Sequence, residues 1–232
     1  MHTSTARVNK NVRPFTQILE GTPSVSNYYG FSPLKKGDLL PVIKHPASQI
    51  IHPGSSIQEN LPKDITPVEL AALGNGKRPL VILFRPTFNH NPFGQIEFLN
   101  TLQADIQIMG GSLLIVSNAP IRDLNRQLHQ FSHLWVLSDP HNSLAEKFGL
   151  FTPDNPIGDW LSGIDDNIPL PAFYVVLPNG EISFHYIDYN FRTYQGNQED
   201  IYQQAVIRQL LTRVYQDAQF INHNRNPAFK HP

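Results

Sequence analysis

Two kinds of hydrophobic pattern alternate along the middle of the chain. Short apolar runs rich in Val, Ile and Leu predict strands that are buried on both faces of a sheet. Between them, apolar residues recur every three or four positions, which predicts helices with one buried face. The predicted strands are 79–85, 112–117, 134–137, 172–177 and 181–188, and the predicted helices are 92–109, about 120–131, 139–149 and 198–220.

The order of these segments predicts a mixed α/β sheet. Three strands separated by helices favour parallel pairing through crossover connections. The turn sequence Pro178-Asn179-Gly180 then predicts an antiparallel hairpin that closes the sheet. In its second strand the apolar Ile182 and Phe184 alternate with polar residues, which predicts one exposed face.

Several local signals predict the remaining elements. Short apolar segments at 38–44 and 49–52, joined by a turn with a proline, predict an edge hairpin. A short helix is predicted at 67–73, with Thr66 as its N-cap. Asp139 and Pro140 predict the start of the 139–149 helix as N-cap and first helical residue.

The pattern also divides the chain into regions. Residues 1–36 show no sustained period and are expected to form an irregular arm. Residues 37–216 are expected to form one domain, and 217–232 the end of the last helix and a polar, disordered tail.

Composition narrows the class of partner. The chain has 232 residues and a formal net charge of −1, which gives no reason to expect nucleic acid or an anionic membrane surface as a partner. The beginning is polar, and no apolar run reaches the roughly 18 residues that a membrane span requires. We therefore expect a soluble, cytoplasmic protein.

The chain contains no cysteine. This excludes a disulfide, a thiolate metal site, a cysteine-ligated iron–sulfur cluster and a thiol nucleophile. Any chemistry must therefore use other side chains.

The candidate site is the corner where strand 79–85 passes into helix 92–109, because ligands of α/β sheets bind at the carboxyl ends of strands. Arg85 and the helix N-terminus favour an anionic or oxygen-rich ligand, unless Arg85 is a structural residue paired with a carboxylate. Asn89, His90 and Asn91 form either a polar pocket, with His90 titrating near neutral pH, or a solvated loop with an Asn cap.

Other candidate sites are weaker. His129 and His133 have the spacing of a zinc pair on a helix, but no third ligand has useful spacing, so no metal site is predicted. The acids of the 150–169 loop lack the spacing of a calcium loop and are interpreted as solvated turn residues. They are Asp154, Asp159, Asp165 and Asp166. A set of aromatic residues in irregular segments either forms an interface or packs on its own domain. Its members are Tyr28, Tyr29, Phe31, Phe151 and Trp160.

From about residue 37 to 211 the chain resembles the peroxiredoxins, in particular the alkyl hydroperoxide reductase / thiol-specific antioxidant family. The resemblance implies a thioredoxin-like fold, a homodimer and a strand entered through a cis-proline at Pro171. The matching segments are Gly37-Asp38-Leu39-Leu40-Pro41, Val81-Ile82-Leu83-Phe84-Arg85, 110–117, Leu137-Ser138-Asp139-Pro140 with 145–150, 170–176 with Asn179-Gly180, and 186–192.

The chain departs from the family at the active corner. The family's pattern is an Arg, an aromatic residue and then Cys-Pro-x-Cys at the helix start. An ungapped match from Arg85 places Phe88 at the aromatic position and Asn89 at the peroxide-attacking cysteine, whereas anchoring on the proline places Asn91 there. An Asn amide does not ionise and is not a nucleophile, so thiol peroxidase activity is predicted to be absent.

Two functions are compatible with these residues. The preferred one is a protein of oxidoreductase ancestry that binds a protein partner or small ligand through Arg85, Phe88, Asn89, Asn91 and Pro171. The alternative is an enzyme with non-thiol chemistry, in which His90 is the acid/base and Arg85 holds an anion. The first is preferred because a general base usually has an orienting partner, and the loop offers none. No cofactor or metal is expected.

Overall fold

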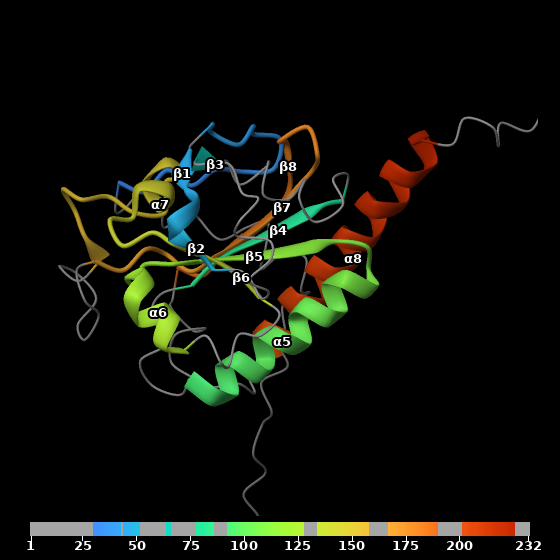
Figure 1. Cartoon of the computed structure of the whole chain (residues 1–232). Helices are drawn as coiled ribbons and strands as arrows, with labels where there is room; N and C mark the ends of the chain where they lie inside the picture. Colours follow the sequence, from blue (N-terminus) through green and yellow to red (C-terminus); the bar gives the residue numbers. More distant parts are fainter. Residues whose placement is uncertain are drawn as a thin grey trace, which may run out of the picture.

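A computed structural model describes residues 30–42, 44–51, 64–65, 78–85, 92–127, 134–157, 167–189 and 201–225. Its centre is a six-stranded mixed sheet with the strand order β2-β6-β5-β4-β7-β8 (Figure 1). The strands are β2 Ile50–Ile51, β4 Leu80–Phe84, β5 Ser112–Ser117, β6 Trp135–Ser138, β7 Ala172–Val176 and β8 Ile182–Ile187.

The strand directions confirm the predicted fold class. Strands β4, β5 and β6 are parallel, β7 runs antiparallel to β4, and β8 runs antiparallel to β7. Three parallel strands closed by an antiparallel hairpin form a thioredoxin-like α/β sheet. All five residues of β4 are buried, as expected for an apolar run in a central strand with helices on both faces.

Helices cover both faces of the sheet. Figure 1 shows α5 and α8 side by side on one face and α7 on the other. A hydrophobic cluster lies beneath α5 and α8, and it includes Leu99, Leu102, Ile106, Leu210 and Val214. The opposite cluster is built around aromatic rings, with the Phe84 and Phe148 centroids 4.7 Å apart. The helices are α5 Pro92–Ile108, α6 Ile121–Gln127, α7 Ser143–Lys147 and α8 Ile201–Arg225.

The predicted hairpin of 38–44 and 49–52 is wrong. β1, His45–Pro46, lies in the segment expected to be the turn, and it pairs with β3, Asp64–Ile65. A 3-10 helix, Ala47–Gln49, follows β1 and leads into β2. β2 then pairs with β6 at the edge of the main sheet, where both of its isoleucines are buried. The apolar pattern correctly placed a strand at Ile50 and Ile51. Its pairing partner could not be predicted, because it depended on the open edge of β6.

The third helix also begins later than predicted. α7 starts at Ser143, whereas Asp139 and Pro140 precede it in a turn. Asp139 still caps the helix, because its Oδ2 accepts hydrogen bonds from the backbone N–H groups of Leu144 (2.9 Å) and Ala145 (3.1 Å). The residue directly before the helix is Asn142, in the left-handed region with φ 54°.

The predicted exposed face of the last strand is also wrong. The pairing between β7 and β8 shifts register between Val175 and Val176, so Ser183 is an extra residue in β8. As a result Ile182 joins the cluster on the α7 side, whereas Phe184 packs on the α8 side. Ser183 is 3% exposed.

Residues 30–36 form no helix or strand. Phe31 is 5% exposed and packs in the core, and the Leu34 N–H donates to the Phe148 carbonyl at 3.0 Å. The last helix continues to Arg225, five residues beyond its predicted end at Phe220. The domain boundary at residue 37 stays a prediction, and the predicted helix 67–73 lies outside the described residues. No helix among the described residues is long and apolar enough to cross a membrane.

Candidate functional site

The carboxyl ends of the three parallel strands meet at one edge of the sheet. Arg85 follows β4 directly, and its N–H donates to the Val116 carbonyl of β5 at 2.9 Å. In the same way the Asp139 N–H, just after β6, donates to the Ser117 carbonyl at 2.8 Å. The parallel hydrogen bonding to β5 therefore continues one residue beyond the ends of β4 and β6. The sheet itself positions the backbone of Arg85.

Arg85 lies opposite Pro171. Phe84 pairs with Ala172 in the antiparallel β4–β7 ladder, so the next step along each strand brings these two residues together. Pro171 is buried, and its carbonyl accepts a hydrogen bond from the Asp188 N–H at 2.8 Å. No peptide bond among the described residues is cis, so Pro171 enters β7 through a trans bond, contrary to what the resemblance implied.

The electrostatics of Arg85 are those of a partly desolvated cation. The residue is half-buried, and burial lowers the pKa of its guanidinium to about 10. The group therefore stays protonated at neutral pH. A charge in such a position interacts with an anion more strongly than it would in bulk water.

A network of three asparagines holds the neighbouring loops of this edge. Asn118, just after β5, donates through Nδ2 to the Asn167 carbonyl at 2.6 Å. The Asn142 Nδ2 donates to the Asn167 Oδ1 at 2.6 Å, and the Asn167 Nδ2 donates to the Pro140 carbonyl at 3.2 Å. The loops after β5 and β6 are thereby tied to the segment that leads into Pro171. Sequence reasoning missed this network, because Asn142 falls inside the predicted helix 139–149 and the three residues lie in separate segments of the chain.

A buried histidine lies beside Asp139. His45 is 7% exposed and Asp139 is 4% exposed. Burial lowers the pKa of His45, and the nearby Asp139 carboxylate opposes that effect. The His45 Nε2 is buried without a hydrogen-bond partner. No local signal in the sequence indicates this pair, because His45 falls in the predicted turn.

Tyr174 lies beneath the corner on the α7 side. Its ring contacts those of Phe84 and Phe148, and its hydroxyl is buried without a hydrogen-bond partner. Burial raises the pKa of Tyr174 well above its usual value, with smaller contributions from Tyr189 and Asp38. The hydroxyl is therefore protonated at neutral pH and has no role as a base.

The structure describes only part of the predicted site. Arg85 and Pro171 are brought together, whereas Phe88, Asn89, His90 and Asn91 lie outside the described residues. Phe31 and Phe151 pack on the core of their own domain, and Asp154 is exposed. Within the described ranges no three metal-ligating side chains form a cluster. Also outside those ranges are Tyr28, Tyr29, His129, His133, Asp159, Trp160, Asp165 and Asp166.

Comparison with known proteins gives similarity in structure only. No family model and no curated protein matches the sequence. Among solved structures, Mycobacterium tuberculosis AhpC has a TM-score of 0.48 at 17% identity, covering 68% of this chain and 84% of that one. Plasmodium vivax 2-Cys peroxiredoxin has a TM-score of 0.47 at 16% identity, covering 67% and 73%. A Chlorobium tepidum protein assigned as thiol:disulfide interchange protein DsbE has a TM-score of 0.48 at 14% identity, covering 78% and 99%.

This chain itself contains no cysteine. The assignment of the fold rests on the strand order and directions of the sheet.

Proposed function

We propose that this protein is a thiol-free member of the peroxiredoxin-like folds that binds a small anionic or oxygen-rich ligand, or a protein partner presenting such a group, at the Arg85 corner. It carries out no thiol-dependent reduction of peroxides. Asn89 or Asn91 takes the place of the attacking cysteine, and Phe88 and Pro171 line the site.

The observation that carries this proposal is the position of Arg85. Its backbone is held by the β4–β5 ladder, the residue is half-buried, and burial lowers the pKa of its guanidinium to about 10. The guanidinium keeps its charge at neutral pH, and its partial burial strengthens the attraction of an anion over that of a fully hydrated cation. The edge of the sheet where it lies is also the edge at which α/β folds bind ligands.

The absence of peroxidase activity follows from chemistry. A thiol peroxidase attacks the O–O bond with a thiolate and passes through a sulfenic acid. The 232 residues contain no cysteine and therefore no thiolate. The test is peroxide consumption with dithiothreitol or thioredoxin as reductant. We expect the rate of the no-protein blank, and any turnover above it would refute this part of the proposal.

Anion binding is tested with inorganic phosphate, followed by NMR on the backbone N–H groups around the corner and, where Arg85 is present, on its side-chain N–H. We expect saturable shifts in the full chain. Arg85→Gln should weaken phosphate binding by about tenfold or more, because a charge-assisted, two-pronged contact is lost. Arg85→Lys keeps the charge without the planar fork and should retain part of the affinity.

Arg78→Gln is the matched control, since Arg78 is exposed and precedes the other end of β4. It should bind phosphate as the unmodified protein does. Non-saturable shifts, or equal affinities for Arg85→Gln and the unmodified protein, would exclude the anion site.

The remaining expectations stay predictions. An enzyme that uses His90 as acid/base has no support from the described residues, because His90 is outside them. A homodimer and a cytoplasmic location are likewise proposed from the resemblance and from composition.

A further inference from the structure

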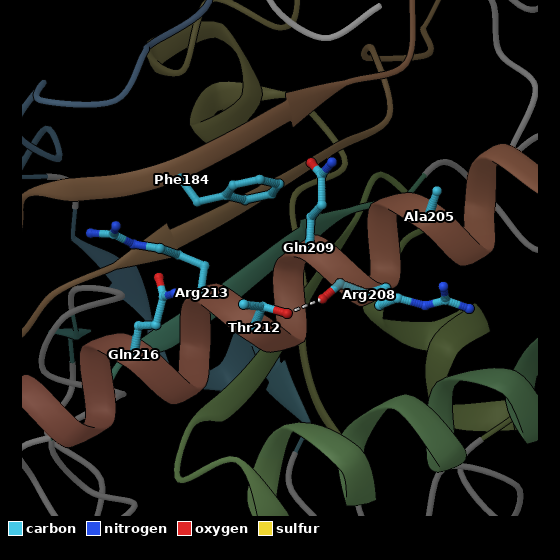
Figure 2. A pocket seen from close by; sticks show the side chains of 7 residues that line it. All are labelled: Phe184, Ala205, Arg208, Gln209, Thr212, Arg213 and Gln216. Atoms are coloured by element: carbon cyan, nitrogen blue, oxygen red, sulfur yellow. Dashed lines mark hydrogen bonds between the residues drawn. The ribbon is translucent and has the colours of Figure 1, made fainter. Parts of the chain in front are cut away.

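A groove of about 590 Å³ lies between α8 and the edge strand β8. Its wall on the strand side is the ring of Phe184, and its helix side carries Arg208, Gln209, Thr212, Arg213 and Gln216. Figure 2 shows Gln209 and Arg213 rising from α8 toward β8 on either side of Phe184, with Arg208 extending away from Arg213. The volume is in the range of small-molecule sites.

The chemistry of the groove is cationic and aromatic. None of its lining residues is acidic. Arg213 forms a two-pronged ion pair with the buried Asp217, through Nη2 to Oδ1 (2.9 Å) and through Nε to Oδ2 (3.1 Å). That ion pair carries no net charge, so the net positive charge of the groove comes from Arg208. Arg208 is exposed, and none of the described residues forms an ion pair with it.

The polar groups differ in their availability. The Thr212 hydroxyl donates to the Arg208 carbonyl of its own helix at 2.8 Å (Figure 2). The guanidinium of Arg208 and the amides of Gln209 and Gln216 therefore remain as the lining groups that can meet a ligand. Figure 2 shows Gln209 beside the Phe184 ring and Arg208 extending from α8 on the side away from it. A planar apolar body on Phe184 with an anionic group at Arg208 would match both features.

The groove is separate from the Arg85 corner. Phe184 lies opposite Val175, and Val175 lies opposite Val81 at the beginning of β4. Arg85 follows the other end of that strand. A ligand in the groove therefore approaches the amino end of β4, on the α8 side of the sheet.

We propose that the α8–β8 groove is a second binding site, which takes a small organic anion with a planar, apolar body. Phe184 provides the stacking surface, Arg208 contacts the anionic group, and the glutamine amides supply hydrogen bonds to its polar atoms.

The test is an NMR titration of the full chain with 2-naphthoate, an aromatic carboxylate. Two further probes separate the contributions: 2-naphthylmethanol has the ring without the charge, and acetate has the charge without the ring. We expect saturable shifts in residues 205–216 and around Phe184, with tighter binding of 2-naphthoate than of either other probe. Added salt should weaken 2-naphthoate binding and leave 2-naphthylmethanol binding unchanged.

Variants locate the site. Arg208→Gln should weaken 2-naphthoate binding by about threefold to tenfold and leave 2-naphthylmethanol unaffected, because only the charge contact is lost. Arg208 is exposed, so this variant is expected to fold. Arg122→Gln, on the exposed surface of α6, is the matched control and should change neither affinity.

Three results would overturn the proposal: no saturation, equal affinity for 2-naphthoate and 2-naphthylmethanol, or an unchanged affinity in Arg208→Gln. Arg85→Gln separates this site from the corner. If Arg85→Gln weakens 2-naphthoate binding and Arg208→Gln does not, the aromatic anion binds at the corner and the groove is not a site.

Discussion

The backbone N–H of Lys36 donates a hydrogen bond to Nδ1 of His185, at 3.2 Å. This hydrogen bond joins the segment before Gly37 to the edge strand β8. An Nδ1 that accepts a hydrogen bond cannot carry a proton, so this contact exists only while His185 is neutral. Burial and the nearby Lys35 lower the pKa of His185, while Asp38 opposes them.

We expect the protein to lose stability in mild acid. Above its ordinary pKa of 6.5, His185 is neutral in both the folded and the unfolded chain. Below 6.5 the unfolded chain binds a proton first, because the pKa is lowered only in the folded state. The free energy of unfolding should therefore fall as the pH drops from 6.5 to the folded-state pKa. Urea unfolding at a series of pH values measures this.

His185→Asn isolates the contribution of this residue. Asn places an acceptor near the position of Nδ1 but does not titrate in this range. The variant should lose part of the pH dependence and keep the part due to His45, whose pKa is lowered in the same direction. His141→Asn, at an exposed position, should follow the unmodified protein. Identical pH profiles for His185→Asn and the unmodified protein would contradict the assignment.

Gly149→Ala should be severely destabilising. Gly149 has φ +68°, and an added Cβ would clash with the Ser32 carbonyl oxygen. Both backbones belong to the packed core region around Phe31 and Phe148, so neither can move freely. We expect a loss of more than about 3 kcal/mol in chemical denaturation, or no folded protein.

Gly180→Ala measures the cost of the left-handed backbone conformation without a steric clash. Gly180 has φ +86°, but nothing lies within 4 Å of an added Cβ. This variant should lose only about 1–2 kcal/mol from the left-handed conformation. Equal losses at the two positions would show that the contact with Ser32 is relieved at little cost.

Asp217 links α8 to β8, and its removal should be costly. It is 5% exposed, and its carboxylate accepts hydrogen bonds from Arg213 and from the Ser183 hydroxyl (2.5 Å). Asp217→Ala leaves the Arg213 guanidinium without its carboxylate and the Ser183 hydroxyl with only the Val175 carbonyl (3.3 Å) as acceptor, and we expect a loss of about 2–3 kcal/mol. Asp123→Ala is the control, because the Asp123–Arg126 pair is exposed and 3.8 Å apart. Asp123→Ala should change the free energy of unfolding by less than about 0.5 kcal/mol. A similarly small change in Asp217→Ala would argue against a stabilising role for the contacts of Asp217 with Arg213 and Ser183.

Tyr174→Phe should be neutral or stabilising. The Tyr174 hydroxyl is buried without a hydrogen-bond partner, whereas its ring packs on Phe84 and Phe148. Phe keeps the ring and removes the unsatisfied group, so we expect a gain of up to about 1 kcal/mol. Tyr215→Phe, at an exposed position, should show no change. A loss above about 1 kcal/mol in Tyr174→Phe would mean that the hydroxyl is hydrogen-bonded in solution.

Elements whose signals lie within a few residues were predicted well. The apolar run 79–85 became β4, and the stripe of Leu99, Leu102 and Ile106 became the buried face of α5. These signals need no knowledge of the partner, because a run of apolar residues is buried whichever strand lies beside it.

Elements that depend on a distant partner were not predicted. Ile50 and Ile51 joined β6 because that strand offered an open edge. The buried position of Ser183 arises from a bulge against β7 and from the Asp217 carboxylate of α8. At the corner, Arg85 was recognised by its place at a strand end, whereas the network of Asn118, Asn142 and Asn167 combines three loops that no local pattern connects.

The sequence by itself determined that this protein has no thiol chemistry and that its centre is a set of apolar strands separated by helices. Those conclusions depend on residue types and short periods, which are local properties. Only the tertiary structure decided that Arg85 lies opposite Pro171 and that Phe184 and Arg208 border one groove. Strand pairing, register and helix packing bring together residues far apart in the chain, and their energies depend on contacts that exist only in the folded state.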